Sequence, residues 1–264
     1  MKTRVIKDLN EAMVIKNKLE NKAVLYGIIF DVGISTGMRV SDILRLTGSN
    51  LKYNKKKEEY KISFIESKGT KARITRAKNL VLNKYRDIGV SILESNIKDK
   101  EQAIELKLTA NKDIYNLLPS SLKAMCDKDI AIAIKKAPKK ERDVGIRKDL
   151  FDSLYNLAYR NKKYTNIFCL HNLKPASKSN KPITRLSVYN AIKAVTDIED
   201  NIGTHSMRKT FARALYESND KDVGLVMRVI GHATPAMSLH YIGIDEEDIA
   251  VATNNLNMFM NQFK

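Results

Sequence analysis

Two histidines, an arginine and a tyrosine lie close together near the carboxyl end of the sequence. His205 and Arg208 are three residues apart, so their side chains leave the same face of a helical turn. His232 follows a glycine, and Tyr241 comes nine residues after it. Arginine presents a planar, permanently charged fork to two phosphate oxygens, histidine carries protons near neutral pH, and a phenol is a nucleophile. The set therefore predicts attack on a phosphate, with a covalent phosphotyrosine as the intermediate.

A second arginine, Arg39, stands in the stretch STGMRVSDILRL. Apolar residues three and four apart predict two helices within residues 8–34, and Ser41-Asp42 is typical of a helix start. Arg39 is thus expected in a turn between packed helices, where a side chain is held rigidly enough to grip a phosphate. Taken alone, the position favours an ordinary surface arginine.

Residues 51–82 alternate apolar and polar side chains, first at Tyr60 and Phe64 and again around Ile74. Lys-Gly-Thr stands between the two runs, so we expect a β-hairpin or small sheet with a basic turn. Residues 52–78 contain ten Lys or Arg against three Glu. Most of these lysines are expected to be solvated or to contact backbone phosphates.

The composition favours a polyanionic partner. Lys and Arg number 47 against 30 Asp and Glu, and the formal net charge of +17 points to nucleic acid. An AT-rich coding sequence would also raise the lysine content, which weakens this argument. No apolar run reaches the roughly 18 residues of a spanning helix, and the N-terminus lacks a signal-peptide core, so we expect no membrane association and a cytoplasmic location. Cys126 and Cys169 have no histidine at metal-ligand spacing, so neither a metal site nor a disulfide is predicted.

The order His-x-x-Arg, Gly-His and a tyrosine nine residues later resembles the C-terminal signature of the tyrosine recombinases, the phage-integrase family, and STGMRVSDILRL resembles that family's first arginine motif. The resemblance covers residues 24–82 and 165–264. It implies the family's catalytic domain, an α+β fold that is mainly α-helical with a small antiparallel β-sheet or hairpin. It also implies site-specific DNA cleavage and rejoining through a 3′ phosphotyrosine, in integration, excision or inversion of a mobile element, without cofactor, ATP or metal.

The resemblance also implies a role for each residue. Tyr241 attacks the scissile phosphate, and His205 accepts the phenolic proton. Arg39 and Arg208 neutralise the charge that grows in the transition state, and His232 helps to hold the phosphate.

In this family a lysine in a hairpin turn protonates the leaving 5′ oxygen. The sequence SKGTKAR matches that turn. Lys68 is therefore the preferred general acid, and Lys71 remains the alternative.

The middle of the chain departs from the family. Residues 1–264 are expected to form a single catalytic domain without the usual N-terminal core-binding domain, because only 38 residues precede Arg39. Residues 90–147 are expected to form a helical, basic insertion. Within it begins the run KKAPKKERDVGIRK, residues 135–148, with seven basic residues against two acidic ones. This run is either a solvated linker or a DNA-contacting arm, and as an arm it would let the insertion replace the clamp domain.

The apolar residues of the tail predict a terminal helix, which in this family docks onto a neighbouring protomer. The expected partners are double-stranded DNA and further copies of the chain in a homotetramer on paired sites, with accessory DNA-bending proteins as a further option. The alternatives are a type IB topoisomerase, which typically has lysine at the position of His205, and a hairpin telomere resolvase. A DNA-binding regulator that kept the fold is disfavoured, because no catalytic position has been lost.

Overall fold

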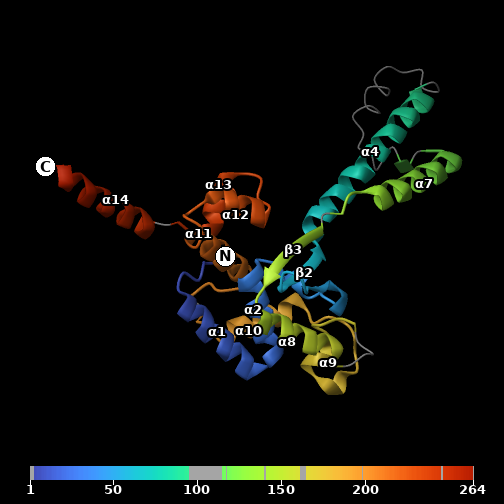
Figure 1. The fold of residues 1–264 in the computed structure, drawn as a ribbon. Coiled ribbons are helices and arrows are strands. Elements are labelled where there is room, and N and C mark those ends of the chain that lie inside the picture. The colour runs from blue at the N-terminus through green and yellow to red at the C-terminus, as the bar shows by residue number, and fades with distance from the viewer. Residues whose placement is uncertain are drawn as a thin grey trace. The chain divides into compact units, whose positions relative to one another are not determined.

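The computed structural model describes residues 3–94, 115–116, 118–139, 141–160, 165–197, 199–244 and 246–263 (Figure 1). Contacts within the chain divide it into two compact units, residues 1–64 with 143–264, and residues 65–142. Each unit has its own hydrophobic core. Within the described ranges, no helix has the length and apolar character of a membrane span.

The first unit is mainly helical. Its helices are α1 (Leu9–Lys22), α2 (Val24–Thr36), α3 (Val40–Ile43), α8 (Lys148–Tyr159), α9 (Leu170–Leu173), α10 (Arg185–Lys193), α11 (Thr204–Glu217), α12 (Val223–Ile230), α13 (Pro235–Ile242) and α14 (Glu246–Met260), with 3-10 turns η1 (Gly48–Asn50), η2 (Pro175–Ser177) and η3 (Asn261–Phe263). The two helices predicted within residues 8–34 are confirmed as α1 and α2.

Helix α2 lies at the centre of this unit. Ile29, Phe30 and Val32 are each 1% exposed or less, so the helix is covered on several sides. An all-round apolar helix must be buried by its neighbours, and α1, α3, α8 and α11 pack against it. The end of α2 is therefore fixed in space, and the turn that follows it carries Arg39.

A three-stranded sheet has the order β1-β2-β3. Strand β1 (Leu51–Asn54) pairs antiparallel with β2 (Glu59–Ile65), with Leu51 opposite Ile62 and Asn54 opposite Glu59. Strand β3 is Glu141–Ile146. The small sheet and the strand through Tyr60 and Phe64 are confirmed, but the hairpin turn lies at residues 55–58.

The prediction of a second strand around Ile74 is wrong. Residues Ser67–Glu94 form one long helix, α4, so Lys68 and Lys71 lie in its first turns and not in a hairpin turn. Val81 and Tyr85, four residues apart, share a face of α4 that packs into a core with helix α7 (Ser120–Lys136). Burial of that helical stripe outweighs the short alternating pattern around Ile74.

The second unit is built on this pair of helices. Tyr85, Leu118, Cys126 and Ile130 form its core, and the Tyr85 hydroxyl donates a hydrogen bond to Asp129 at 2.9 Å. The unit spans residues 65–142, whereas the predicted insertion spans 90–147. It begins earlier because α4 starts directly after β2, and it ends where β3 begins.

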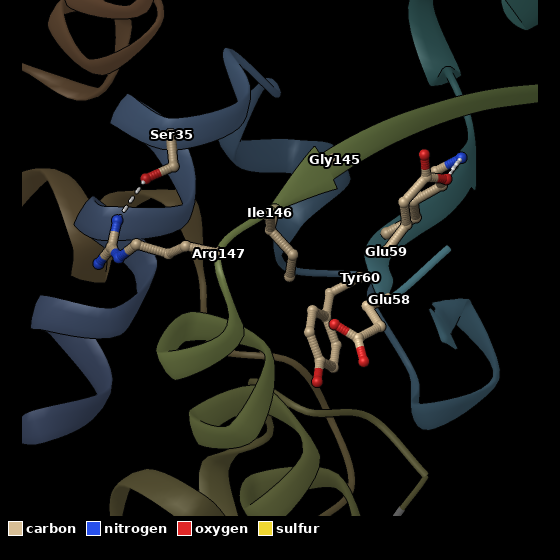
Figure 2. A pocket seen from close by; sticks show the side chains of 8 residues that line it. Ser35, Glu58, Glu59, Tyr60, Gly145, Ile146 and Arg147 are labelled. Atoms are coloured by element: carbon tan, nitrogen blue, oxygen red, sulfur yellow. Dashed lines mark hydrogen bonds and ion pairs between the residues drawn. The ribbon is translucent and has the colours of Figure 1, made fainter. Parts of the chain in front are cut away.

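The basic run at residues 135–148 does not form one free basic surface. Its ion pairs are Arg142 with Glu66, Arg147 with Asp31 and Asp149, and Lys148 with Asp152. Figure 2 shows Arg147 turned toward Ser35, to which it donates a hydrogen bond at 3.1 Å, beside a pocket lined by Tyr60 and Ile146. Three of the run's seven basic residues are therefore ion-paired within the protein.

Three glycines of the described residues adopt the left-handed backbone, and a Cβ would clash with a neighbouring side chain at Gly37 and Gly243 but not at Gly231. Gly37 ends α2 at φ 62°, and a Cβ there would lie 2.3 Å from Cδ1 of Phe211. Gly231 ends α12 at φ 78° with open space around it, and Gly145 has open space without a positive φ.

We expect Gly37→Ala to lower the free energy of unfolding by about 3 kcal/mol, because backbone strain and overpacking add. Gly231→Ala should cost about 1–2 kcal/mol from strain alone, and Gly145→Ala should stay within about 0.5 kcal/mol of the parent. Urea denaturation followed by circular dichroism measures the series. Equal effects at all three positions would contradict this steric account.

Candidate active site

The side chain of Arg208 joins three segments of the first unit. It lies on α11, it is 3% exposed, and it donates hydrogen bonds to the carbonyl oxygens of Gly37 and of Ile230, the latter at 2.7 Å. Gly37 belongs to the turn that carries Arg39, and Ile230 ends α12 just before His232. A buried charge must be hydrogen-bonded, so this guanidinium fixes both turns against α11.

Arg39 lies in a turn directly before a helix, as predicted. It is the N-cap residue of α3, with φ −70° and ψ 141°, and it is half-buried. Its carbonyl oxygen accepts hydrogen bonds from the backbone N–H groups of Asp42 at 2.7 Å and Ile43 at 3.0 Å. The backbone under the Arg39 guanidinium is therefore held in place.

His205 lies among positive charges in the first turn of α11. Although the residue is accessible to solvent, the protein shields part of the ring, and this desolvation lowers its pKa. The positive charges that lower its pKa further are those of Arg185, Arg208, Arg39 and Lys209. Since the pKa of an unperturbed histidine is about 6.5 and that of His205 is lowered, His205 is neutral at pH 7 and can accept a proton.

Sequence reasoning did not identify Arg185. It is the first residue of α10, whose N-cap Thr184 accepts a hydrogen bond from the backbone of Ser187 at 3.0 Å. The helix start is recognisable from the sequence, because Thr184 is a typical N-cap. The electrostatic effect of Arg185 on His205 depends on how α10 and α11 pack together, which the local sequence does not show.

His232 and Tyr241 lie next to each other. Their ring centroids are 4.5 Å apart in an edge-on arrangement, and Nδ1 of His232 is 3.0 Å from the hydroxyl of Ser238. Ser238 is fully buried on α13, so it orients the imidazole. Tyr241 is half-buried against a small core that includes Ile230. Ser238 was also not identified from the sequence, although its place three residues before Tyr241 puts it on the same helical face.

Five of the six predicted residues thus belong to the first unit, and the contacts described above connect them: Arg39, His205, Arg208, His232 and Tyr241. Lys68 belongs to the second unit, where both it and Lys71 are exposed on α4. The five together supply a nucleophilic phenol, a neutral imidazole and guanidinium groups, which are the parts required for attack on a phosphodiester.

Comparison with known proteins supports the same chemistry. A sequence model of the phage integrase family matches residues 112–248, which is more than half of the chain. A "probable integrase/recombinase YoeC" from Bacillus subtilis (strain 168) is 28% identical over 174 residues, covering 65% of this chain and 91% of that protein.

Solved structures show the likeness of fold. The XerH site-specific recombinase, in a post-cleavage complex with a palindromic difH substrate, matches with a TM-score of 0.53 and 16% identity over 96% of this chain. The XerA recombinase matches with a TM-score of 0.54 and 12% identity over 97% of this chain and 66% of its own. This chain covers 53% of the XerH chain, so it spans about half that length. The predicted fold class, a mainly helical domain with a small sheet, is confirmed.

We predict that Arg185→Gln raises the pKa of His205, because removing a nearby positive charge makes the imidazolium less unfavourable. Titration of the imidazole C–H signals by NMR measures this, and His205→Gln assigns the signal. Arg213→Gln is the control, since Arg213 lies on the same helix as His205 but pairs with Glu217 at 2.9 Å. An unchanged titration in Arg185→Gln would show that this charge does not act on His205.

Proposed function

The chain belongs to the phage integrase family, whose members are tyrosine-type site-specific recombinases, and on this premise we propose that it cuts and rejoins duplex DNA through a 3′ phosphotyrosine at Tyr241. The observation that carries the proposal is the contact between Tyr241 and His232, at 4.5 Å between ring centroids, in a site whose turns are joined by Arg208. The site places a phenol next to an imidazole and also contains a buried guanidinium, and these groups support nucleophilic attack on phosphorus.

In the proposed first step, the phenolic oxygen of Tyr241 bonds to the scissile phosphorus and the bond to the 5′ oxygen breaks. The phenolic proton passes to His205, whose lowered pKa keeps it neutral and ready to accept. The leaving 5′ oxygen takes a proton from Lys68, with Lys71 as the alternative. The strand then carries a 3′ phosphotyrosine and a free 5′ hydroxyl.

The charge that develops on the phosphate oxygens is stabilised by Arg39 and Arg208, while His232, held by Ser238, donates a hydrogen bond to the phosphate. In the second step a 5′ hydroxyl attacks the phosphotyrosine and releases Tyr241. One phosphoester replaces another in each step, so the bond energy is conserved. No ATP, metal or other cofactor enters this scheme.

The proposed partners are double-stranded DNA and further copies of this chain. Helix α14 exposes large apolar side chains, among them Leu256 at 57% and Met258 at 68%. A helix with this much exposed apolar surface favours docking onto a protein, which supports a homotetramer on paired DNA sites. We further propose that the first unit is the catalytic domain, that the second is an insertion in it, and that the reaction takes place on DNA in the cytoplasm.

Tyr241→Phe should abolish the covalent protein–DNA adduct on a nicked suicide substrate, because only the nucleophilic oxygen is removed. DNA binding should remain close to that of the parent, since the ring that packs against His232 is retained. Gel analysis of trapped adducts measures the first effect. Tyr216→Phe, a change in the same small core, should leave the adduct intact. An adduct that persists in Tyr241→Phe would show a different nucleophile.

Lys68→Ala should slow cleavage by roughly 10²-fold or more, and a substrate with sulfur in place of the leaving 5′ oxygen should restore the rate, because a thiolate leaves without a proton. Single-turnover cleavage of both substrates measures this, with Lys71→Ala tested in parallel. Rescue of Lys71→Ala instead would make Lys71 the general acid. Rescue of neither variant would remove both lysines from that role.

A further inference from the structure

Helix α4 carries a long stretch of basic residues without acidic ones. From Ser67 to Arg86 the sequence has seven Lys or Arg and no Asp or Glu, and the first acidic residue is Asp87. The basic residues are Lys68, Lys71, Arg73, Arg76, Lys78, Lys84 and Arg86. At a rise of about 1.5 Å per residue this stretch is about 30 Å long.

Some of these charges repel one another within the helix. Lys68 and Lys71 are three residues apart, as are Arg73 and Arg76, and like charges at this spacing destabilise a helix. A polyanion bound along α4 would offset that repulsion.

Most of the charge on α4 is available to a partner. Lys68, Lys71, Arg76, Lys78 and Lys84 are exposed, and none of them is ion-paired with an acidic residue in the part of the chain that the structure describes. Three acidic residues of the same unit have other partners. Glu66 pairs with Arg142, and Asp127 and Asp129 accept hydrogen bonds from the hydroxyls of Tyr115 and Tyr85.

The neighbouring helix α7 offers a useful contrast. It also exposes three lysines, Lys128, Lys135 and Lys136, but Asp127 and Asp129 lie among its charges. In the basic run at residues 135–148, Arg142, Arg147 and Lys148 are held in ion pairs. Within the described residues, α4 thus exposes five basic side chains without an ion pair, against three on α7, where two aspartates lie among the lysines.

We propose that α4 binds the phosphate backbone of duplex DNA through the exposed side chains of Arg76, Lys78 and Lys84, as a contact surface additional to the catalytic residues. The choice of DNA as the polyanion rests on the proposed function. An anionic membrane fits less well, because the apolar stripe of α4 is covered by the core shared with α7. The one aromatic residue between Ser67 and Arg86, Tyr85, is 3% exposed, so the surface contacts phosphates and does not stack on bases.

The salt dependence of binding reports such a surface. Each phosphate contact contributes about −0.9 to the slope of log affinity against log salt concentration, because bound counterions are released. The contact is independent of base sequence, so it adds affinity at every site. It leaves the chemistry at Tyr241 unchanged once the protein is saturated with DNA.

The test compares three variants of the full chain on one duplex by fluorescence anisotropy over a salt series. Arg76→Gln/Lys78→Gln/Lys84→Gln removes three charges from α4, and Lys128→Gln/Lys135→Gln/Lys136→Gln removes three from α7. Arg76→Lys/Lys78→Arg/Lys84→Arg keeps the charge of α4. We expect the slope to become shallower by about 2–3 units in the first variant, by less than about one in the second, and not at all in the third.

Equal slopes in the two Gln variants, or a parental slope in the α4 variant, would overturn the proposal. Circular dichroism checks that α4 remains folded, and if the triple variant unfolds, Arg76→Gln and Lys78→Gln singly should each shift the slope by about one unit. The covalent adduct at saturating protein is measured in the same samples. If the parent chain forms no adduct, the proposed function is contradicted. The slopes of log affinity against log salt concentration test α4 independently of cleavage.

Discussion

The buried guanidinium of Arg208 is the interaction on which the arrangement of the site depends. Hydrogen bonds from a charged donor contribute about 1.5–3 kcal/mol each, and a buried charge left without them is costly. Because Arg208 donates to the carbonyls of Gly37 and Ile230, the turn after α2 and the turn after α12 cannot shift separately. Arg39 and His232 are carried by these two turns, so the guanidinium of Arg208 sets the distance between them.

Charge in this protein serves two purposes that net charge alone does not separate. Arg4, Arg142 and Arg147 pair with carboxylates and hold segments together. Arg39, Arg185 and Arg208 instead lower the pKa of His205, because their positive charges disfavour its protonation. Only the partners of each arginine distinguish these uses, and a sequence count treats all of them alike.

The sequence allowed the first unit to be predicted more closely than the second. Helices α1 and α2, the turn holding Arg39 and the His205–Arg208 helix follow from spacing within a few residues, which is local information. Helix α4 was mistaken for a strand because KARIT alternates over a short window. Its helical state depends on burial against α7, whose Cys126 and Ile130 lie about forty residues away in the chain. Arg185 and Ser238 were missed for a similar reason, since their importance arises from tertiary contacts with His205 and His232.

The position of the second unit between β2 and β3 also affects how the sheet can fold. Strands β1 and β2 are joined by a short turn, but β3 joins the sheet only after residues 66–140 have been bridged. Loop-closure entropy grows with the length of flexible chain, by about 0.6 kcal/mol for each doubling. A unit with its own core can fold first and shorten the flexible chain that remains. The order of folding would then run from α4 and α7 to the third strand, so the sheet is completed late and its completion depends on the helices of the second unit.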